Sequence, residues 1–372
     1  MKRIVLSAGG TGGHIFPALA VADELRERYP WADIVFVGGE KELERYWAEK
    51  AGLSFVSLPA KGVMGRGIRS LGSLWWICRS LLKCSAFYRR FRPEVVVGFG
   101  SYAGFVPVWL ACRQRIPAAI HEQNKRPGMT NKVLGQKVDR VFVTFPDESE
   151  SFPKDKVVPT GNPVRKDLLR MGEQEKRYAH EGARNILVLG GSQGAQVLNQ
   201  VILRALPSLA SYSVNIMHQT GEQDFEQVRA EYTRQGLDDA LVRPFIDDMG
   251  AAYRWADLVI CRAGASTVAE LTVMGRPSIL IPFPYATHAH QLDNARYLEQ
   301  QGAAYILEQS YLDEVNLTHM IGDLLSLPSK LKEMGSAARK LSRPDAAQRI
   351  VNGLEGLLGE SGGQSNHARG DA

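Results

Sequence analysis

The 372-residue sequence lacks the long apolar stretches that mark membrane-spanning proteins, and nothing at its N-terminus resembles the signal peptide of secreted proteins. No stretch approaches the roughly 20 uninterrupted apolar residues that cross a bilayer, and the first residues already read as a strand rather than a signal peptide. Cysteine is scarce, and Cys78, Cys84, Cys112 and Cys261 show no metal-ligand spacing. The simplest location is therefore a reducing cytoplasm.

Several nucleotide-binding signatures are also missing. After Gly10-Thr11-Gly12 the sequence has Ile15 where the G-x-G-x-x-G fingerprint needs its last glycine, and Gly190 to Gly194 also miss that spacing. There is no Walker loop and no D-x-D pair to hold a metal against a diphosphate. A diphosphate site would have to use helix dipoles, hydroxyls and basic side chains instead.

What the chain does have is glycine-rich turns between strands and helices. In "RIVLSAGGTGGHIFPALAVADEL" (3–25) an apolar strand is followed by four glycines, a threonine and His14, and then by a helical pattern. Such a turn offers unpaired N–H groups and a helix dipole to an anion. A tight turn without a ligand is the alternative.

The same order of strand, glycine-rich turn and helix repeats in the second half, which indicates two similar domains. "NILVLGGSQGAQVLNQVILRAL" (185–206) restates the opening, and "DLVICRAGASTVAELTVMG" (257–275) restates "EVVVGFGSYAGFVPVWLAC" (94–112). Alternating strands and helices predict α/β domains with doubly wound parallel sheets. We expect an N-terminal domain over 1–162 and a C-terminal domain over 163–339. A helix at about 340–358 should pack back on the first domain, and 359–372 should be a disordered tail.

Positive charge is concentrated in one segment. Between Lys50 and Val138 there are fifteen Lys or Arg against Glu94 and Glu122, a charge of +13, so the remainder carries −8 of the total +5. This block indicates an anionic partner. No recognised nucleic-acid module accompanies it, so nucleic acid is not the expected partner.

The second half contains the groups that a metal-free diphosphate site needs. Ser192 lies at one helix start, Ser266 and Thr267 lie at another, and Arg262 and Arg165 are the basic side chains expected to join them. Ser266 and Thr267 could equally be plain helix caps.

Eight motifs occur in order: "GGTGGH" (9–14), "GFGSYAG" (98–104), "HEQN" (121–124), "GNPVR" (161–165), "GGSQGA" (190–195), "FIDDM" (245–249), "CRAGASTVAEL" (261–271) and "HQLDNA" (290–295). With this set the chain resembles the MurG family of UDP-N-acetylglucosamine transferases, which add the second sugar to the lipid-linked peptidoglycan precursor. The resemblance covers the chain to about residue 350.

The resemblance implies the GT-B fold, in which two Rossmann-like domains face a cleft, and an inverting transfer of GlcNAc to the C4 hydroxyl of MurNAc. It makes His14 the candidate base, with His121 as the competing base beside Glu122. It places His121, Glu122, Gln123 and Asn124 on the acceptor side, for binding or orientation, together with Tyr102. A buried tyrosine with a satisfied hydroxyl is the alternative for Tyr102. No cofactor or metal is expected, apart from the substrate UDP-GlcNAc itself.

The donor side is implied in the same way. Glu270 would accept hydrogen bonds from the ribose hydroxyls, although helix dipole alone also favours an acid near a helix start. Ile246 would meet the uracil through its backbone, while His290, Gln291 and Asn294 would reach the sugar, His290 being a position that varies in the family. The remaining expected donor contacts are Thr11, Gly12, Gly13, Asn124, Arg165, Ser192, Gln193, Arg262, Ala265, Ser266 and Thr267.

A lipid acceptor directs attention to "SLGSLWWICRSLLKCSAFYRRFR" (70–92). Its aromatic residues and cations suit a helix on an anionic leaflet, although the leucine stripe of Leu71, Leu74, Leu81 and Leu82 fits an ordinary core helix. The expected membrane contacts are Trp75, Trp76, Arg79 and Lys83. Lys61, Arg66 and Arg69 are expected to meet the acceptor diphosphate.

Two other functional classes stay open at this point. Non-hydrolysing UDP-GlcNAc 2-epimerases share the architecture, and a membrane-docked sensor could bind a UDP-sugar without catalysis. The transferase interpretation places the protein at the inner face of the bacterial plasma membrane, in cell-wall synthesis, with links to cell shape and division. Its expected partners are the MurNAc-pentapeptide lipid and proteins of cell-wall synthesis and division.

Overall fold

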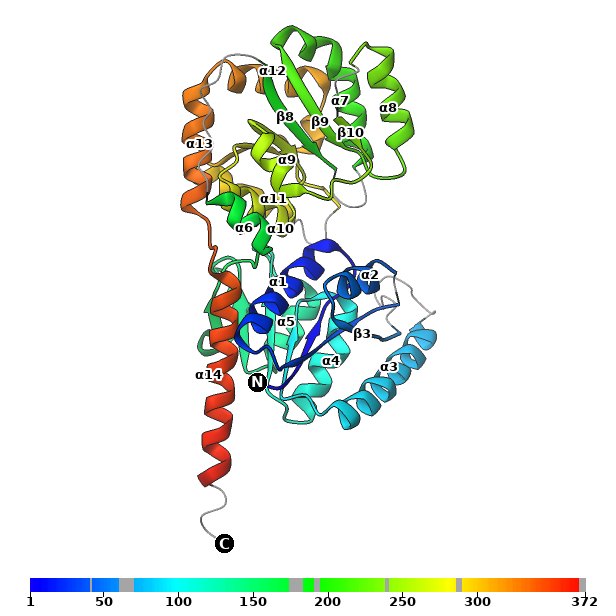
Figure 1. Ribbon diagram of the computed structural model, residues 1–372, viewed down its shortest axis with the longest axis vertical. Coiled ribbons are helices and arrows are strands. Elements are labelled where there is room, and N and C mark those ends of the chain that lie inside the picture. Colours follow the sequence, from blue (N-terminus) through cyan, green and yellow to red (C-terminus); the bar gives the residue numbers. More distant parts are fainter. Residues whose placement is uncertain are drawn as a thin grey trace. The chain divides into compact units, whose positions relative to one another are not determined.

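The computed structural model describes residues 1–40, 42–59, 70–173, 183–190, 195–237, 241–285 and 290–367, with side chains of 70–74 and 360–367 excepted. The chain forms two compact units (Figure 1), Met1–Arg165 with Arg343–Ala372, and Lys166–Ser342. The sequence pattern predicts a boundary after residue 162, and the contacts within the structure place it after Arg165. Each unit is an α/β domain built on one parallel sheet, the predicted fold class.

The first unit contains a seven-stranded sheet in the order β3-β2-β1-β4-β5-β6-β7. Its strands are β1 Arg3–Ser7, β2 Asp33–Gly38, β3 Ser54–Ser57, β4 Val95–Gly98, β5 Ala118–Glu122, β6 Arg140–Val143 and β7 Val157–Pro159. All pairings are parallel, and Val5 lies opposite Val35 on one side and Val96 on the other. Because both faces are covered, the strands are continuous apolar runs.

Helices cover the two faces of this sheet. They are α1 Gly12–Arg28, α2 Glu42–Lys50, α3 Ser70–Phe91, α4 Ser101–Arg113, α5 Met129–Gly135 and α14 Ala346–His367, with a short 3₁₀ turn η2 at Lys154–Lys156. On one face, α1 and α14 bury Leu25 and Ile350 against strand residues such as Phe36. On the other, α3 and α4 bury Tyr88 and Val108.

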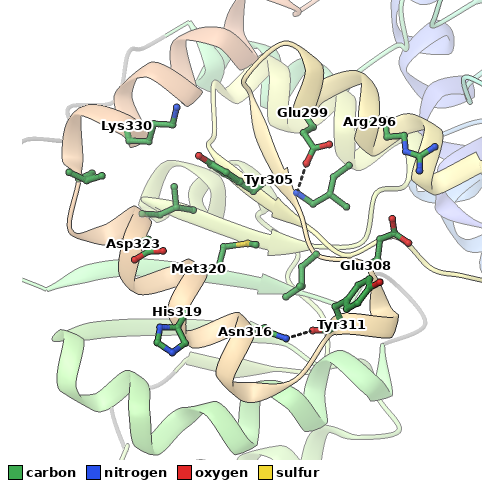
Figure 2. Close-up of a pocket in the computed structure, with 14 residues that line it drawn as sticks. Arg296, Glu299, Tyr305, Glu308, Tyr311, Asn316, His319, Met320, Asp323 and Lys330 are labelled. Carbon is green, nitrogen blue, oxygen red and sulfur yellow. Dashed lines mark hydrogen bonds between the residues drawn. The ribbon is translucent and has the colours of Figure 1, made fainter.

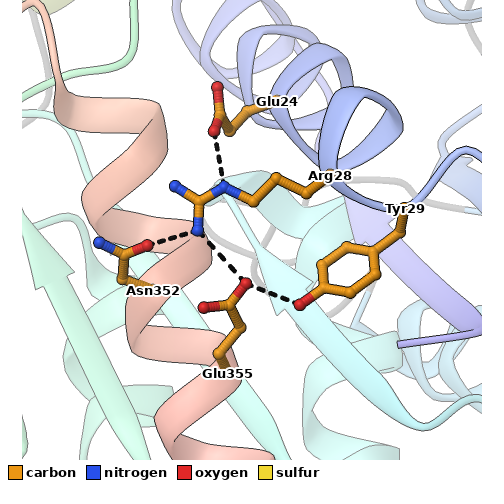
Figure 3. Close-up of polar contacts among 5 residues, drawn as sticks. All are labelled: Glu24, Arg28, Tyr29, Asn352 and Glu355. Atoms are coloured by element: carbon orange, nitrogen blue, oxygen red, sulfur yellow. Dashed lines mark hydrogen bonds and ion pairs between the residues drawn. The ribbon is translucent and has the colours of Figure 1, made fainter.

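The α14 helix comes from the far end of the chain and packs on α1 (Figures 1 and 3). Arg28 donates to Glu24 of its own helix at 2.8 Å and to Glu355 of α14 at 3.2 Å, and it also donates to Asn352. The Tyr29 hydroxyl donates to Glu355 at 2.6 Å. This polar cluster borders the apolar contact between the two helices.

The C-terminal segment differs from the expectation in two respects. Pro344 separates α13 (Pro328–Lys340) from α14, so the helix expected from about residue 340 begins only at Ala346. The α14 helix then continues to His367, so 359–367 are helical and the predicted disordered tail is wrong there; 368–372 lie outside the described residues. Extending an existing helix adds one hydrogen bond per residue fixed, whereas a new helix needs a costly nucleus.

The second unit repeats the plan with six parallel strands in the order β10-β9-β8-β11-β12-β13. These are β8 Arg184–Leu189, β9 Val214–Gln219, β10 Leu241–Arg243, β11 Leu258–Cys261, β12 Ser278–Leu280 and β13 Ala304–Ile306. The helices are α6 Lys166–Gly172, α7 Gln196–Leu209, α8 Phe225–Arg234, α9 Met249–Trp255, α10 Ala265–Met274, α11 His290–Gln300, α12 Glu314–Leu325 and α13, with 3₁₀ turns η3 Ala210–Tyr212 and η5 Gln309–Tyr311. Central strand residues, including Ile186 and Ile260, pack under α7, α8, α12 and α13.

A fully buried histidine is part of this second core. His218 contacts the Tyr232 hydroxyl through Nδ1 and the Asn199 Oδ1 through Nε2, each at 3.1 Å. Burial lowers the pKa of His218 to about 3, so the ring is neutral in the folded protein at neutral pH.

Candidate functional site

Each sheet has a point where the strand order reverses, between β1 and β4 in the first unit and between β8 and β11 in the second. Loops diverge there, and ligands of open α/β sheets bind outside the carboxyl ends of those strands. The helices that start at these points are α1, α4 and α10, and none has an acid in its first turn. Their N-terminal N–H groups can therefore face an anion without a competing carboxylate of their own.

The glycine-rich turn after β1 is held by Glu44, a residue that no pattern in the sequence singles out. The carboxylate of Glu44, on α2 and 2 % exposed, accepts the N–H of Gly10 at 2.7 Å and the N–H of Gly39. A Cβ at Gly9 or Gly38 would lie 2.8 or 2.7 Å from Glu44 oxygens. Two of the glycines thus make room for a carboxylate of the protein itself, a signal that only the fold reveals.

His14 lies in the first turn of α1, half-buried, with its ring against the loop after β4. Its Nδ1 is 3.0 Å from Oε1 of Gln123, which follows β5. Burial lowers the pKa of His14, while the hydrogen bond with Gln123, the nearby Phe99 carbonyl and the charge of Glu44 oppose this shift. A neutral imidazole at neutral pH is suited to accept a proton.

The competing base has no comparable access. His121 is completely buried, its Nε2 is 3.0 Å from the Gly161 carbonyl, and its Nδ1 is 3.1 Å from Gln123 Nε2. Burial lowers the pKa of His121 to about 4. Because both ring nitrogens are engaged inside the protein, the geometry argues against His121 as the base.

Glu122 is also buried, and it organises the loop that follows β5. It accepts hydrogen bonds from the N–H groups of Asn124 and Gly128 at 2.9 and 3.1 Å and from the Asn131 amide at 2.8 Å. Burial raises the pKa of Glu122, and these hydrogen bonds oppose the rise. Contacts of this kind give Glu122 a structural role instead of the catalytic one suggested beside His121.

Other expected residues of the first unit lie at the same edge of the sheet. They include Arg165, which the sequence pattern assigns to the second half and the structure assigns to the first unit. Thr11 precedes α1 and is exposed, and Gly12, buried against the Phe16 ring, and Gly13 form the start of the helix. Tyr102, in the first turn of α4, is 46 % exposed, which rules out the alternative of a buried tyrosine. The Arg165 guanidinium stacks over Phe16 at 5.0 Å, and its Nε is buried without a hydrogen-bond partner in the described structure.

In the second unit, the start of α10 holds the expected hydroxyls. Gly264 is the N-cap and Ala265 is the first helical residue, so Ser266 and Thr267 follow inside the first turn and are not helix caps. Glu270 lies one turn after Ser266, and its Oε2 accepts a hydrogen bond from the Tyr253 hydroxyl at 2.9 Å. Since the first turn of α10 has no acid, a simple dipole preference does not account for Glu270.

Three residues that are expected to contact the sugar donor form hydrogen bonds to neighbouring loops. Arg262, whose pKa burial lowers, donates to the carbonyl of Ile281 at 3.1 Å and to Gln309 at 2.8 Å. Gln291 accepts the N–H of Phe283 at 2.9 Å. The buried Asn294 donates to the Ala263 carbonyl at 3.2 Å, beside the start of α10. Their geometry supports the loops around α10.

The remaining expected residues divide between the described and undescribed parts. Ile246 is buried, and its N–H donates to Gln219 at 3.2 Å. Of its two backbone groups, the carbonyl is therefore the one that could contact the uracil. His290 begins α11 and is partly buried. Ser192, Gln193, Lys61, Arg66 and Arg69 lie outside the described residues.

The basic α3 helix has an exposed apolar face. Trp75 is 57 % and Leu82 is 72 % exposed, and Arg79 lies over the Trp75 ring at 5.3 Å. The core side is made by Ser80, Cys84 and Tyr88 instead. A core role for the leucine stripe is therefore wrong at Leu82, because the helix turns this residue outward. No described helix of the chain is long and apolar enough to cross a membrane.

A cavity of about 830 Å³ lies elsewhere in the second unit (Figure 2). Residues of α11, the edge strand β13, α12 and α13 line it, among them Tyr305, Met320 and Lys330. None of the expected donor residues lines this cavity, and it lies at the sheet edge instead of the β8–β11 reversal.

Comparison with known protein families finds one match in each half of the chain. Residues 4–143 match the glycosyltransferase family 28 N-terminal domain, and residues 185–350 match the glycosyltransferase family 28 C-terminal domain. A protein from Nitratidesulfovibrio vulgaris (strain DSM 19637 / Miyazaki F), named UDP-N-acetylglucosamine–N-acetylmuramyl-(pentapeptide) pyrophosphoryl-undecaprenol N-acetylglucosamine transferase, is 47 % identical over 97 % of this chain and 99 % of its own. A protein of the same name from Geobacter sp. (strain M21) is 43 % identical over 94 % of each.

Solved structures extend the comparison. The crystal structure of Acinetobacter baumannii MurG superposes with a TM-score of 0.75 and 32 % identity, over 95 % of this chain and 99 % of that one. A putative UDP-N-acetylglucosamine 2-epimerase from Listeria monocytogenes reaches a TM-score of 0.71 at 16 % identity, over 97 % of this chain and 98 % of that one, which is a likeness of fold alone. By its near-complete match to relatives of high identity, the chain belongs to the MurG family of glycosyltransferases, with the GT-B fold.

Proposed function

We propose that the protein transfers GlcNAc from UDP-GlcNAc to the C4 hydroxyl of MurNAc in undecaprenyl-pyrophosphoryl-MurNAc-pentapeptide. The observation that carries this proposal is the 47 % identity over nearly the whole length of a transferase of that name. The two strand-order reversals, each with an acid-free helix start, supply the kind of site that two phosphorylated substrates need.

The transfer is an inverting single displacement. The acceptor C4 oxygen attacks the anomeric carbon of GlcNAc, the bond from that carbon to the UDP oxygen breaks, and UDP leaves with the electron pair. His14 takes the proton of the attacking hydroxyl. Its lowered pKa keeps it neutral at neutral pH, which is the form that a general base requires.

The leaving diphosphate is stabilised without a bound metal in this proposal. The N-terminal N–H groups of α10 and the hydroxyls of Ser266 and Thr267 can donate to its oxygens. Glu270 accepts from the ribose hydroxyls, with Tyr253 orienting the carboxylate at 2.9 Å. Arg262, Gln291 and Asn294 hold the loops that shape this pocket.

The test is transfer of labelled GlcNAc from UDP-GlcNAc to a short-chain analogue of the lipid-linked MurNAc-peptide, with EDTA present. A β1,4-linked disaccharide together with released UDP supports the proposal and a metal-free site. Product that appears only after magnesium is added would retain the transferase and reject the metal-free site. Epimerised sugar, or intact donor under both conditions, would reject the transferase in favour of the epimerase or the sensor.

The base is tested separately. His14→Ala is expected to lower kcat by about 10² or more with UDP affinity unchanged, the effect of losing a general base. A near-normal kcat would remove His14 from the mechanism. Replacing His319, an exposed histidine of α12, by alanine is the matched control and should leave kcat unchanged.

We propose further that the first unit docks on the anionic inner face of the plasma membrane through α3. Trp75, Arg79 and Leu82 are spaced by four and three residues, which puts them on one helical face. All three are exposed, and Lys83 lies next to them in sequence. Aromatic and aliphatic groups beside cations suit the boundary between head groups and acyl chains.

Vesicle sedimentation tests this docking. Wild-type protein should bind vesicles that contain anionic lipid and bind phosphatidylcholine vesicles much less. Trp75→Ser with Leu82→Ser should weaken binding, whereas Trp31→Ser, which removes another exposed tryptophan of the same unit, should not. If the Trp75→Ser, Leu82→Ser variant bound anionic vesicles as strongly as Trp31→Ser, docking through the α3 face would be excluded.

A further inference from the structure

We infer that Gln123 is a positioning residue that holds His14 in the tautomer with hydrogen on Nδ1, so that Nε2 carries the lone pair that accepts the proton. The inference rests on the proposed function only in treating His14 as the base. It follows from a chain of hydrogen bonds in which each donor and acceptor is dictated by the one before.

The chain starts at Gly161, whose carbonyl can only accept. His121 Nε2 lies 3.0 Å from this oxygen, so Nε2 must carry a hydrogen. Because burial lowers the pKa of His121 to about 4, the ring is neutral at neutral pH and has no second hydrogen. Its Nδ1 is therefore an acceptor.

The next group is the Gln123 amide, whose orientation this acceptor fixes. The atom 3.1 Å from His121 Nδ1 must be the NH₂ group, since two acceptors cannot pair. The same nitrogen lies 3.0 Å from the Phe99 carbonyl and 3.1 Å from the His121 carbonyl, which are both obligate acceptors. Both amide hydrogens are thus directed inward, and the amide cannot flip without losing two hydrogen bonds in a buried site.

The remaining amide atom, Oε1, then faces His14. It lies 3.0 Å from Nδ1 and can only accept, so Nδ1 of His14 must donate. A neutral ring with hydrogen on Nδ1 has its lone pair on Nε2. Gly100 permits this arrangement, because a Cβ there would lie 3.2 Å from both Nδ1 and Cε1 of His14 and its φ of +92° is one that glycine adopts readily.

The relay gives "HEQN" a role that its sequence does not suggest. Gln123 is 1 % exposed and His121 is completely buried, so neither is placed to touch a substrate directly. Both act on the reaction through His14. The fixed tautomer removes the need for the ring to exchange its proton position before each transfer, an advantage of pre-organisation.

The first test is ¹⁵N NMR of the full-length protein with ¹⁵N-labelled histidine, at neutral pH and without substrate. The His14 signals are identified by their loss in His14→Asn. We expect a protonated Nδ1 and an unprotonated Nε2. Hydrogen on Nε2, or averaged shifts from a mixture of tautomers, would overturn the inference. Because no substrate is used, this result is independent of whether the proposed transfer occurs.

The second test replaces the acceptor by a charge. Gln123→Glu puts a carboxylate beside the Nδ1 hydrogen and should raise the pKa on the acid side of the kcat/KM profile by about one unit or more. Gln136→Glu, which makes the same exchange at an exposed position of the first unit, should leave the profile unmoved. A folded Gln123→Glu enzyme in which the ¹⁵N spectrum places the hydrogen of the neutral His14 ring on Nε2 would refute the inference. If that variant does not fold, the NMR result decides.

Discussion

The substitution Glu44→Gln tests how the glycine-rich turn after β1 is held in place. The buried carboxylate of Glu44 accepts two backbone hydrogen bonds, from Gly10 at 2.7 Å and from Gly39. In Glu44→Gln the amide oxygen can accept one of these N–H groups, and the other meets an NH₂ group that cannot accept. Losing one hydrogen bond to a charged buried group costs about 1.5–3 kcal/mol, so the first unit should lose that much stability.

The same substitution should affect catalysis, because the turn carries His14 four residues after Gly10. Displacement of a reacting group by about 1 Å can reduce a rate by about 10²-fold, so we expect kcat to fall at least tenfold with KM for UDP-GlcNAc nearly unchanged.

The free energy of unfolding is measured by urea denaturation of the full-length protein, followed at the transition of the first unit. Hydrogen exchange of the Gly10 amide measures how firmly the turn is anchored. Glu42→Gln, an exposed change on the same helix, is the control and should stay within about 0.5 kcal/mol of wild type. Unchanged exchange at Gly10 together with unchanged kcat in Glu44→Gln would refute the anchoring argument.

Three further predictions concern the donor side, acid stability and α14. Glu270→Ala should raise the apparent KM for UDP-GlcNAc, measured by steady-state kinetics, and an unchanged KM would make the ribose assignment wrong. Burial lowers the pKa of His218 to about 3, so below pH 6.5 the unfolded chain binds a proton that the folded protein does not. The free energy of unfolding of the second unit should therefore fall by up to about 1.4 kcal/mol per pH unit between about pH 6.5 and pH 3. Urea unfolding measures this fall, which should be smaller in His218→Gln. Glu355→Ala should cost less than about 1 kcal/mol because its side chain is partly exposed, whereas Ile350→Ala, completely buried, should cost about 2–5 kcal/mol, a difference that thermal unfolding resolves.

The sequence predicted the fold well because period and spacing report directly on it. Apolar runs closed by glycine, such as Ile4 to Leu6 and Val95 to Val97, are the parallel strands that they indicate. Repetition of this pattern after residue 184 predicted a second sheet, and the second sheet has the corresponding strand order. Helix boundaries near the C-terminus were less accessible, since the continuation of α14 to His367 depends on an existing helix more than on local composition.

Site residues were predictable as neighbours but not as partners. Sequence order places His14, His121 and Gln123 at strand ends of one sheet edge, yet it cannot tell which ring reaches the surface. Burial settles that: His121 lies completely inside and His14 does not. Glu44 was invisible for the same reason, because an acid in the first turn of a helix is ordinary and only the packed structure shows it against Gly9 and Gly38.

The return of α14 to the first unit has a consequence for synthesis of the chain. Ile350, Val351 and Leu354 fill the same apolar cluster as Ile4 and Leu25, yet they are translated after the whole of Lys166–Ser342. The second unit can therefore complete its core on the ribosome while the first, although synthesised earlier, still exposes the surface that α14 covers. A premature stop before Ile350 would therefore remove part of the core of the first unit and destabilise the N-terminal half of the protein.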